Sequence, residues 1–295
     1  MTRPGPILAA MLTPFDAQGM VDETAIGPMV DLVLGQGIDG LYAGGSTGEC
    51  VLQSLEQRQV LLRALADYAK GKCTLVAHVG SAATGDAQML ARTAGDAGFD
   101  AVAAVPPYYY KFSAGEIADY YAAIADASDL PLIVYHIPVL TGVNMTLAEL
   151  ERLLGDDRVI GIKFTDSDLF KFERLINAAP DKLHYFGSDE MFLGAAAMGA
   201  YGGIGSTYNV IGGLIVAIKA AVDAGDLPTA RALQTRANEF IAILLKVGVV
   251  PGLKHALAQL GAPIGQCLPP FKKPAADALA QLDTWLATQN RHLAD

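Results

Sequence analysis

One lysine stands inside an otherwise apolar run, Val159 to Phe164, whose letters are VIGIKF. Burial penalises the charged form of an amine, so a lysine in such a run needs a partner charge or loses its proton more readily. The neutral amine is a nucleophile that attacks a carbonyl carbon and forms an imine. We therefore predict that Lys163 is a Schiff-base lysine acting on a 2-keto acid. Two other roles stay open, in which Lys163 extends to the surface or pairs with Glu49.

A glycine-rich segment, Gly44 to Glu49 with the letters GGSTGE, follows another short apolar run. Glycines let a ligand approach the backbone closely, and the hydroxyls and amides of Ser46 and Thr47 can donate hydrogen bonds to a carboxylate. The segment therefore predicts an anion cradle, with a plain tight turn as the alternative. A phosphate-binding loop would need a lysine where Ser46 stands, so the pattern does not favour phosphate.

Tyr135 lies near the end of the apolar run one β-α unit before Lys163. In a parallel barrel the two runs are neighbouring strands that end at the same face, which places a phenol beside the amine. A phenol with a nearby cation or hydrogen-bond relay can transfer protons. We predict this role for Tyr135, with side-chain packing as the alternative.

Polar residues follow the last two apolar runs, namely Asp189 and Glu190, then Ser206. They offer acceptors and donors to a polyhydroxylated ligand such as a sugar. Paired carboxylates can also bind a divalent metal, but the five histidines show no metal-binding spacing, so we predict no metal. An aromatic run, Tyr108 to Tyr110, is typical of packing or of an interface.

All these residues follow short apolar runs that alternate with helical patterns along the chain. Eight such units favour an α/β fold, a (β/α)8 TIM barrel with its site where the strands end, over a doubly wound sheet. The amphipathic segments include Leu55 to Ala69, Asp86 to Ala97 and Glu116 to Ala127. The predicted strands are Ile7 to Leu12, Gly40 to Ala43, Thr74 to Val79, Ala101 to Val105, Leu132 to Ile137, Val159 to Phe164, His184 to Phe186 and Gly202 to Gly205.

The chain is predicted to have two parts, a barrel over residues 1–224 that carries the active site and a C-terminal helical extension over residues 225–295 that packs on it. A net charge of -10 with no basic run argues against a nucleic-acid partner. No apolar stretch is long enough for a membrane span, and the N-terminus does not resemble a signal peptide. Three scattered cysteines suit a reducing cytoplasm.

The glycine-rich segment, Tyr135 with Pro138, and Lys163 together resemble the pyruvate-dependent class I aldolases that include dihydrodipicolinate synthase and N-acetylneuraminate lyase. The resemblance covers nearly the whole chain. It implies a barrel with three C-terminal helices, assembled as a homotetramer. It also implies that Lys163 forms the Schiff base, that Tyr135 transfers the proton, and that Ser46 and Thr47 hold the pyruvate carboxylate.

Within this family the synthase branch carries an arginine five residues after the catalytic tyrosine, where this chain has Leu140. The surrounding stretch resembles the neuraminate-cleaving branch instead. The resemblance therefore implies reversible cleavage of N-acetylneuraminate to N-acetylmannosamine and pyruvate, with no cofactor. Tyr109 matches a tyrosine that reaches a neighbouring subunit's site in relatives. The residues implied to bind the sugar acid are Thr165, Gly187, Asp189, Glu190 and Ser206.

Other functions stay open. A related aldolase or dehydratase that acts on another 2-keto sugar acid would keep Lys163 and Tyr135 and change the sugar-binding set. Leu140 disfavours 4-hydroxy-tetrahydrodipicolinate synthase, and the intact Lys163 and Tyr135 pair disfavours a non-catalytic sugar-acid binding protein. A metal-dependent barrel aldolase would lose its activity in the presence of a chelator.

Overall fold

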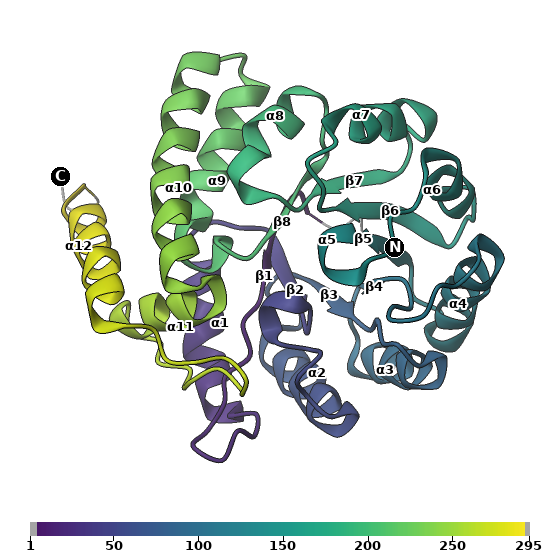
Figure 1. Ribbon diagram of the computed structural model, residues 1–295, viewed down its shortest axis with the longest axis horizontal. Coiled ribbons are helices and arrows are strands. Elements are labelled where there is room, and N and C mark those ends of the chain that lie inside the picture. Colours follow the sequence, from purple (N-terminus) through teal and green to yellow (C-terminus); the bar gives the residue numbers. More distant parts are fainter. Residues whose placement is uncertain (1–4, 293–295) are drawn as a thin grey trace.

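The core of the molecule is a closed barrel of eight parallel strands in sequence order, with β8 hydrogen-bonded to β1 (Figure 1). The computed structural model describes residues 5–292. The predicted (β/α)8 TIM barrel is confirmed. The strands are β1 (Ile7–Ala10), β2 (Gly40–Ala43), β3 (Thr74–His78), β4 (Ala101–Ala104), β5 (Leu132–His136), β6 (Val159–Phe164), β7 (Leu183–Phe186) and β8 (Gly202–Gly205).

Helices surround the barrel and connect its strands (Figure 1). They are α1 (Ile26–Leu34), α2 (Leu55–Ala69), α3 (Thr84–Ala97), α4 (Ala114–Ser128), α5 (Pro138–Thr141), α6 (Leu147–Leu154), α7 (Leu169–Ala178), α8 (Phe192–Ala197) and α9 (Tyr208–Asp223). Short 3-10 helices are η1 (Glu23–Ala25), η2 (Ser46–Gly48) and η3 (Asp189–Met191). The predicted cradle therefore contains a 3-10 turn, η2, shortly after β2. The predicted sugar-binding residues Asp189 and Glu190 lie in a second 3-10 turn, η3, shortly after β7.

Side chains of the strands alternate between two apolar clusters. One cluster fills the space between the barrel and its helices, and the other, which includes Tyr42, Tyr135 and Tyr185, fills the barrel interior. In the sheet register Lys163 lies opposite Tyr135 on one side and Tyr185 on the other. Lys163 therefore shares the inner face of the barrel with these two tyrosines.

The strand and helix bounds differ from the predicted ones by at most two residues. The first predicted strand includes Met11 and Leu12, which stay buried although the paired strand ends at Ala10. The run of apolar residues is longer than the strand because the chain stays buried for two more residues before it enters the loop at the barrel mouth. At α4 the helix begins at Ala114, since Ser113 and Glu116 form a reciprocal capping box.

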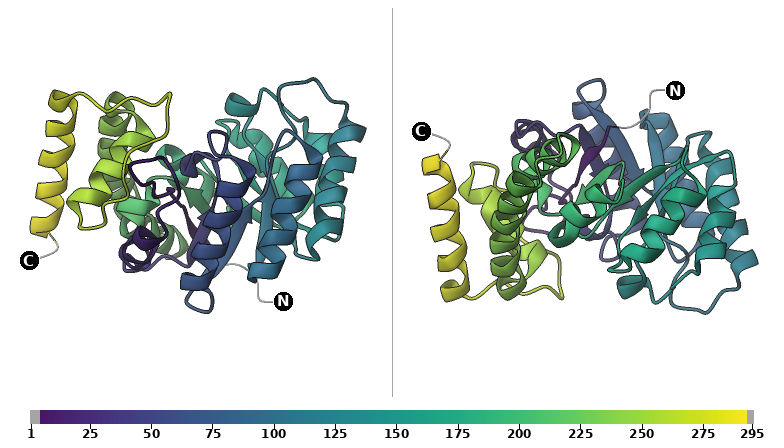
Figure 2. Two further views of the ribbon diagram at one scale, coloured as in Figure 1. Left: turned by 90° about the horizontal axis from the view of Figure 1, so that it is seen from below. Right: turned by 90° about the horizontal axis from the view of Figure 1, so that it is seen from above.

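Three further helices follow the eighth unit, α10 (Leu227–Val247), α11 (Val249–Gln259) and α12 (Ala276–His292). They stack on one side of the barrel next to α9, with α12 outermost (Figures 1 and 2). Trp285 of α12 packs on Phe240 of α10 with ring centroids 4.7 Å apart. The division of the chain at residue 224 stays a prediction.

Within residues 5–292, no single helix is long and apolar enough to cross a membrane. The helices α10 and α11 meet the same length and composition criteria only as a pair, and this pair is bent by 114°.

Candidate active site

Lys163 lies at the end of β6 with 4% of its surface exposed. Its Nζ lies 4.2 Å from the ring centroid of Tyr135 and 4.6 Å from that of Tyr42. Among the described residues it forms neither an ion pair nor a hydrogen bond. The two alternatives for this lysine are therefore wrong: it does not reach the surface, and Glu49 pairs with Lys254 instead.

The two tyrosine rings beside this amine form an aromatic cluster with His78 on the inner face of the barrel. Tyr135 packs edge-on against Tyr42 at 6.1 Å and against His78 at 6.0 Å between ring centroids. The buried Tyr42 hydroxyl has no hydrogen-bond partner among the described residues, and burial raises the Tyr42 pKa well above its usual value. Sequence reasoning missed Tyr42, although its position on the inner face of β2 was a usable signal.

The predicted cradle is a tight turn with an unusual backbone. Ser46–Gly48 form η2, and Glu49 ends it in the left-handed region with φ 61°. A Cβ at Gly45 would lie 2.7 Å from the Tyr42 ring, so only glycine fits there. The hydroxyls of Ser46 and Thr47 form no hydrogen bond within residues 5–292, which leaves them available to a ligand.

His78 holds the start of this turn. Its Nδ1 donates to the Gly44 carbonyl at 3.0 Å, and its Nε2 accepts from the Val105 amide at 3.4 Å. These two bonds fix a neutral ring with the proton on Nδ1, and burial lowers the His78 pKa well below its usual value. The Arg58 guanidinium donates to the His78 carbonyl at 2.9 Å, which ties α2 to the end of β3.

The predicted sugar-binding residues begin with two that crowd the lysine. A Cβ at Gly187 would lie 1.9 Å from Thr165 Oγ1 and 3.1 Å from Lys163 Cε, so glycine is what lets β6 and β7 end this close together. The Thr165 hydroxyl is buried and has no partner among the described residues. An unpaired buried hydroxyl beside the amine is suited to a ligand oxygen.

Asp189 is buried, and one of its oxygens holds the loop after β8. Its Oδ2 accepts hydrogen bonds from the Thr207 amide at 2.9 Å and the Thr207 hydroxyl at 2.6 Å. Its Oδ1 has no partner within the described chain, and burial raises the Asp189 pKa to about 6. Asp189 therefore joins two mouth loops and still offers one free oxygen. Glu190 is exposed and Ser206 is half-buried.

Tyr109 does not join the other candidates within one chain. It is 87% exposed, has a positive φ of 83°, and packs edge-on against Tyr110 at 5.1 Å. Positive φ strains a residue with a side chain, so the surrounding loop holds this ring outward at a cost.

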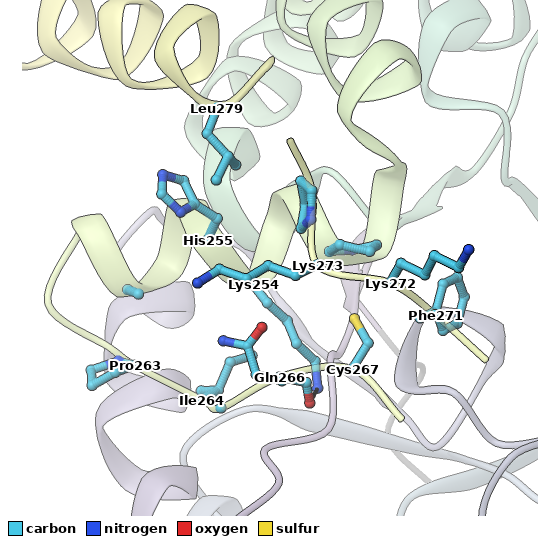
Figure 3. A pocket seen from close by; sticks show the side chains of 14 residues that line it. Lys254, His255, Pro263, Ile264, Gln266, Cys267, Phe271, Lys272, Lys273 and Leu279 are labelled. Atoms are coloured by element: carbon cyan, nitrogen blue, oxygen red, sulfur yellow. Dashed lines mark hydrogen bonds between the residues drawn. The ribbon is translucent and has the colours of Figure 1, made fainter. Parts of the chain in front are cut away.

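Two cavities lie near these elements. One of about 410 Å³ has a lining that includes Ser46, His78, Tyr108 and Leu140 but not Lys163. A larger cavity of about 630 Å³ lies between α11 and the segment that follows it, and its wall includes Lys254, Lys272 and Lys273 (Figure 3). We take the smaller cavity as part of the candidate active site because Ser46 lines it, whereas none of the predicted site residues lines the larger one. Within the described chain, no group of three or more His, Cys, Asp or Glu could hold a metal ion.

A TIM barrel whose mouth presents a buried strand-end lysine, a neighbouring phenol and an open hydroxyl turn defines a class, the barrel enzymes that act on small carbonyl compounds. Residues 3–289 match the model of the dihydrodipicolinate synthetase family. The chain belongs to this family.

Its relatives include proteins of one named activity. The N-acetylneuraminate lyase of Rhizobium meliloti is 48% identical over 276 residues, which are 94% of this chain and 92% of that protein. The structure of CdNal from Clostridium difficile in complex with mannosamine superposes with a TM-score of 0.95 at 34% identity, over 97% of this chain and 99% of the other. The N-acetylneuraminate lyase of Fusobacterium nucleatum complexed with pyruvate gives 0.91 at 33% identity, over 96% of each chain.

Proposed function

We propose that this protein is a class I aldolase that cleaves N-acetylneuraminate reversibly to N-acetylmannosamine and pyruvate. The observation that carries the proposal is the amine of Lys163, buried at a strand end without a carboxylate partner and 4.2 Å from the Tyr135 ring. The likeness to lyases that bind an amino sugar or pyruvate supports the same substrates.

In the proposed reaction the Lys163 amine attacks the C2 ketone of the open-chain sugar acid, and water leaves to give an imine. Tyr135 takes the proton of the C4 hydroxyl while the C3–C4 bond breaks. The electron pair of that bond moves into the imine, which becomes an enamine, and N-acetylmannosamine leaves as the aldehyde. Protonation of the enamine at C3 and hydrolysis of the imine then release pyruvate and the free lysine. The imine is the electron sink, so the proposal needs no cofactor.

The other residues take binding roles in this proposal. The open hydroxyls of Ser46 and Thr47 donate to the carboxylate next to the ketone. Toward the sugar end, the ligand meets Thr165, Gly187, Asp189, Glu190 and Ser206. Tyr109 is exposed and contacts none of the other proposed site residues of its own chain, and it serves the site of a second chain in a homotetramer.

We extend the proposal to the setting of the protein. Free thiols at Cys50, Cys73 and Cys267 are consistent with our proposal that the protein works in a reducing cytoplasm. The barrel over residues 1–224 and the extension over residues 225–295 are the two parts that we propose for the chain.

Borohydride trapping tests the proposal. Incubation with pyruvate and borohydride should add a reduced pyruvate imine to Lys163, located by peptide mass spectrometry, and Lys163→Ala should remove both the adduct and the turnover of N-acetylneuraminate. Near-normal turnover in the variant would refute the mechanism. A panel of other 2-keto sugar acids, and aspartate semialdehyde with pyruvate, distinguishes the related activities, for which Leu140 offers no cationic side chain.

A further inference from the structure

Glu49 links the cradle to the C-terminal helices. Its Oε1 forms an ion pair with Lys254 Nζ of α11 at 2.9 Å, and its Oε2 accepts from the Leu268 amide at 2.7 Å. Both charged side chains are almost fully buried. The same Nζ also donates to the Gln266 carbonyl at 3.0 Å, and Figure 3 shows Lys254 beside Gln266 and Cys267. Parts of the chain more than two hundred positions apart therefore meet on one carboxylate.

This carboxylate belongs to the residue that ends η2 in a left-handed conformation. Such a conformation costs energy for a residue with a side chain, so it persists only where the surroundings fix it. Lys254 and the Leu268 amide supply that fixation from outside the barrel. They act on Glu49, which lies one residue after Gly48 and two after Thr47, and Ser46 lies in the same turn.

A second link runs from α10 to the sugar side. Gln234 is buried, and its Nε2 donates to the Asp189 carbonyl at 3.0 Å while its Oε1 accepts from the Leu193 amide at 2.9 Å. Asn238, one helical turn further, donates to the Glu190 carbonyl at 3.1 Å. Two side chains of α10 therefore fix the backbone of η3, which carries the two carboxylates.

We propose that the C-terminal extension positions the two ends of the substrate separately. Lys254 sets the turn that receives the keto-acid carboxylate, and Gln234 with Asn238 sets the segment that receives the sugar hydroxyls. None of the three is assigned to touch substrate, so they are positioning residues. The inference rests on the proposed function, because it uses that function's two substrates to tell the two ends apart.

The separation follows from the arrangement of the contacts. The Lys254 link reaches η2 after β2, whereas the Gln234 and Asn238 links reach η3 after β7. In the barrel these two strands are not neighbours, and β1 and β8 lie between them. A change at one link should therefore leave the geometry at the other end intact.

Kinetics in the synthesis direction test this. Initial rates with pyruvate and N-acetylmannosamine varied in turn give a KM for each. Lys254→Met should raise the KM for pyruvate at least about tenfold and leave that for N-acetylmannosamine within about twofold. The double variant Gln234→Met/Asn238→Ala should show the reverse pattern. If both KM values move together in both variants, or if neither moves, the inference is wrong.

A buried charge left without its partner destabilises a protein, so folding needs its own control. Glu49→Gln/Lys254→Met removes both charges; it should recover thermal stability yet keep the raised KM for pyruvate. Lys254→Arg restores a cation and should return that KM toward the wild-type value. Recovery of a normal KM in the double variant would mean that the pair affects stability alone.

Lys219→Met is the matched control, because Lys219 pairs with Asp223 on the surface of α9. It should leave both KM values unchanged. The wild-type protein separates the two proposals, because no borohydride adduct and no turnover in the wild type would refute the proposed function. An active wild type together with variants in which both KM values change in parallel, or do not change, would refute only the positioning role.

Discussion

The amine of Lys163 meets aromatic faces where a structural lysine would meet a carboxylate. Ring faces attract a cation less strongly than a carboxylate does, and among the described residues no carboxylate pairs with this amine. Glu49, the carboxylate that the sequence offered as a possible partner of Lys163, forms its ion pair with Lys254. Among residues 5–292, two lysines are buried in different surroundings: Lys254 is paired with a carboxylate, and Lys163, the proposed nucleophile, is not.

Tyr135→Phe tests the role of the phenol. The ring would still pack against Tyr42 and His78, so stability should change little. Loss of a proton-transfer group should lower kcat for N-acetylneuraminate cleavage about 10²- to 10⁴-fold. Trapping of pyruvate on Lys163 by borohydride should persist. An unchanged kcat would show that another group moves the proton.

Asp189 predicts a pH dependence. Burial raises its pKa to about 6, so the carboxylate is lost as the pH falls through that value. If the free Oδ1 accepts a sugar hydroxyl, kcat/KM for the sugar acid should fall below about pH 6. The Asp189→Asn variant should lack this acid limb, as measured by pH-rate profiles at low substrate concentration. The same limb in the variant would assign it to another group.

The contribution of Asp189 to folding stability should change with pH in the direction opposite to its contribution to activity. An unfolded aspartate has a pKa of about 3.9, so between about pH 4 and pH 6 the folded protein binds more protons at Asp189 than the unfolded chain does. The contribution of this group to the free energy of unfolding is therefore present below about pH 4 and is lost as the pH rises through about 6. Asp189→Asn should remove that contribution, which thermal melts across this range would detect.

At the scale of elements, the ends of β6 and β7 approach so closely that only glycine fits at residue 187. Gly187→Ala would place a Cβ against Thr165 Oγ1, and overpacking of this kind costs about 1–3 kcal/mol. We expect a lower melting temperature and weaker trapping of pyruvate, because Lys163 Cε is the next atom displaced. Adding Thr165→Ala removes the oxygen and should recover part of the stability. Full stability of the single variant would contradict this account.

The sequence predicted the strands well because burial on both faces leaves its signal in the residues themselves, and β2, β6 and β8 begin and end where predicted. It also predicted that Lys163 and Tyr135 lie together, since strand order alone fixes that. It did not single out Tyr42, because an inward tyrosine looks the same in sequence whether it faces a ligand or the core.

The partner of Glu49 was beyond sequence patterns for another reason. Its contact with Lys254 depends on how α11 docks against the barrel, which no local periodicity encodes. The burial of Asp189 was missed in the same way, since it results from Thr207 of the next loop and Gln234 of α10.

At the scale of the whole molecule, large apolar side chains are exposed near the barrel mouth. They include Val51, Tyr109, Tyr110, Val139 and Leu140. Exposed aromatic and aliphatic groups of this kind are typical of surfaces that bind another chain. They support the proposed homotetramer.

Light scattering after gel filtration checks this assembly, and the expected mass is that of four chains. Tyr109→Ala should leave pyruvate trapping by each chain possible while lowering kcat, because the ring would serve a neighbouring site. Mixing this variant with Lys163→Ala chains should restore part of the activity if sites are shared. A fully active monomer would contradict both expectations.

The tie between Glu49 and the far end of the chain also bears on synthesis. Chains are made from the amino terminus, and early parts begin to fold while later parts are still in the ribosome. All eight strands precede α11, so the barrel can close before Lys254 and Leu268 have emerged. A nascent chain at that stage has Lys163 in place but a cradle that Lys254 does not yet hold, so we expect it to bind the keto acid weakly until α11 has emerged and docked.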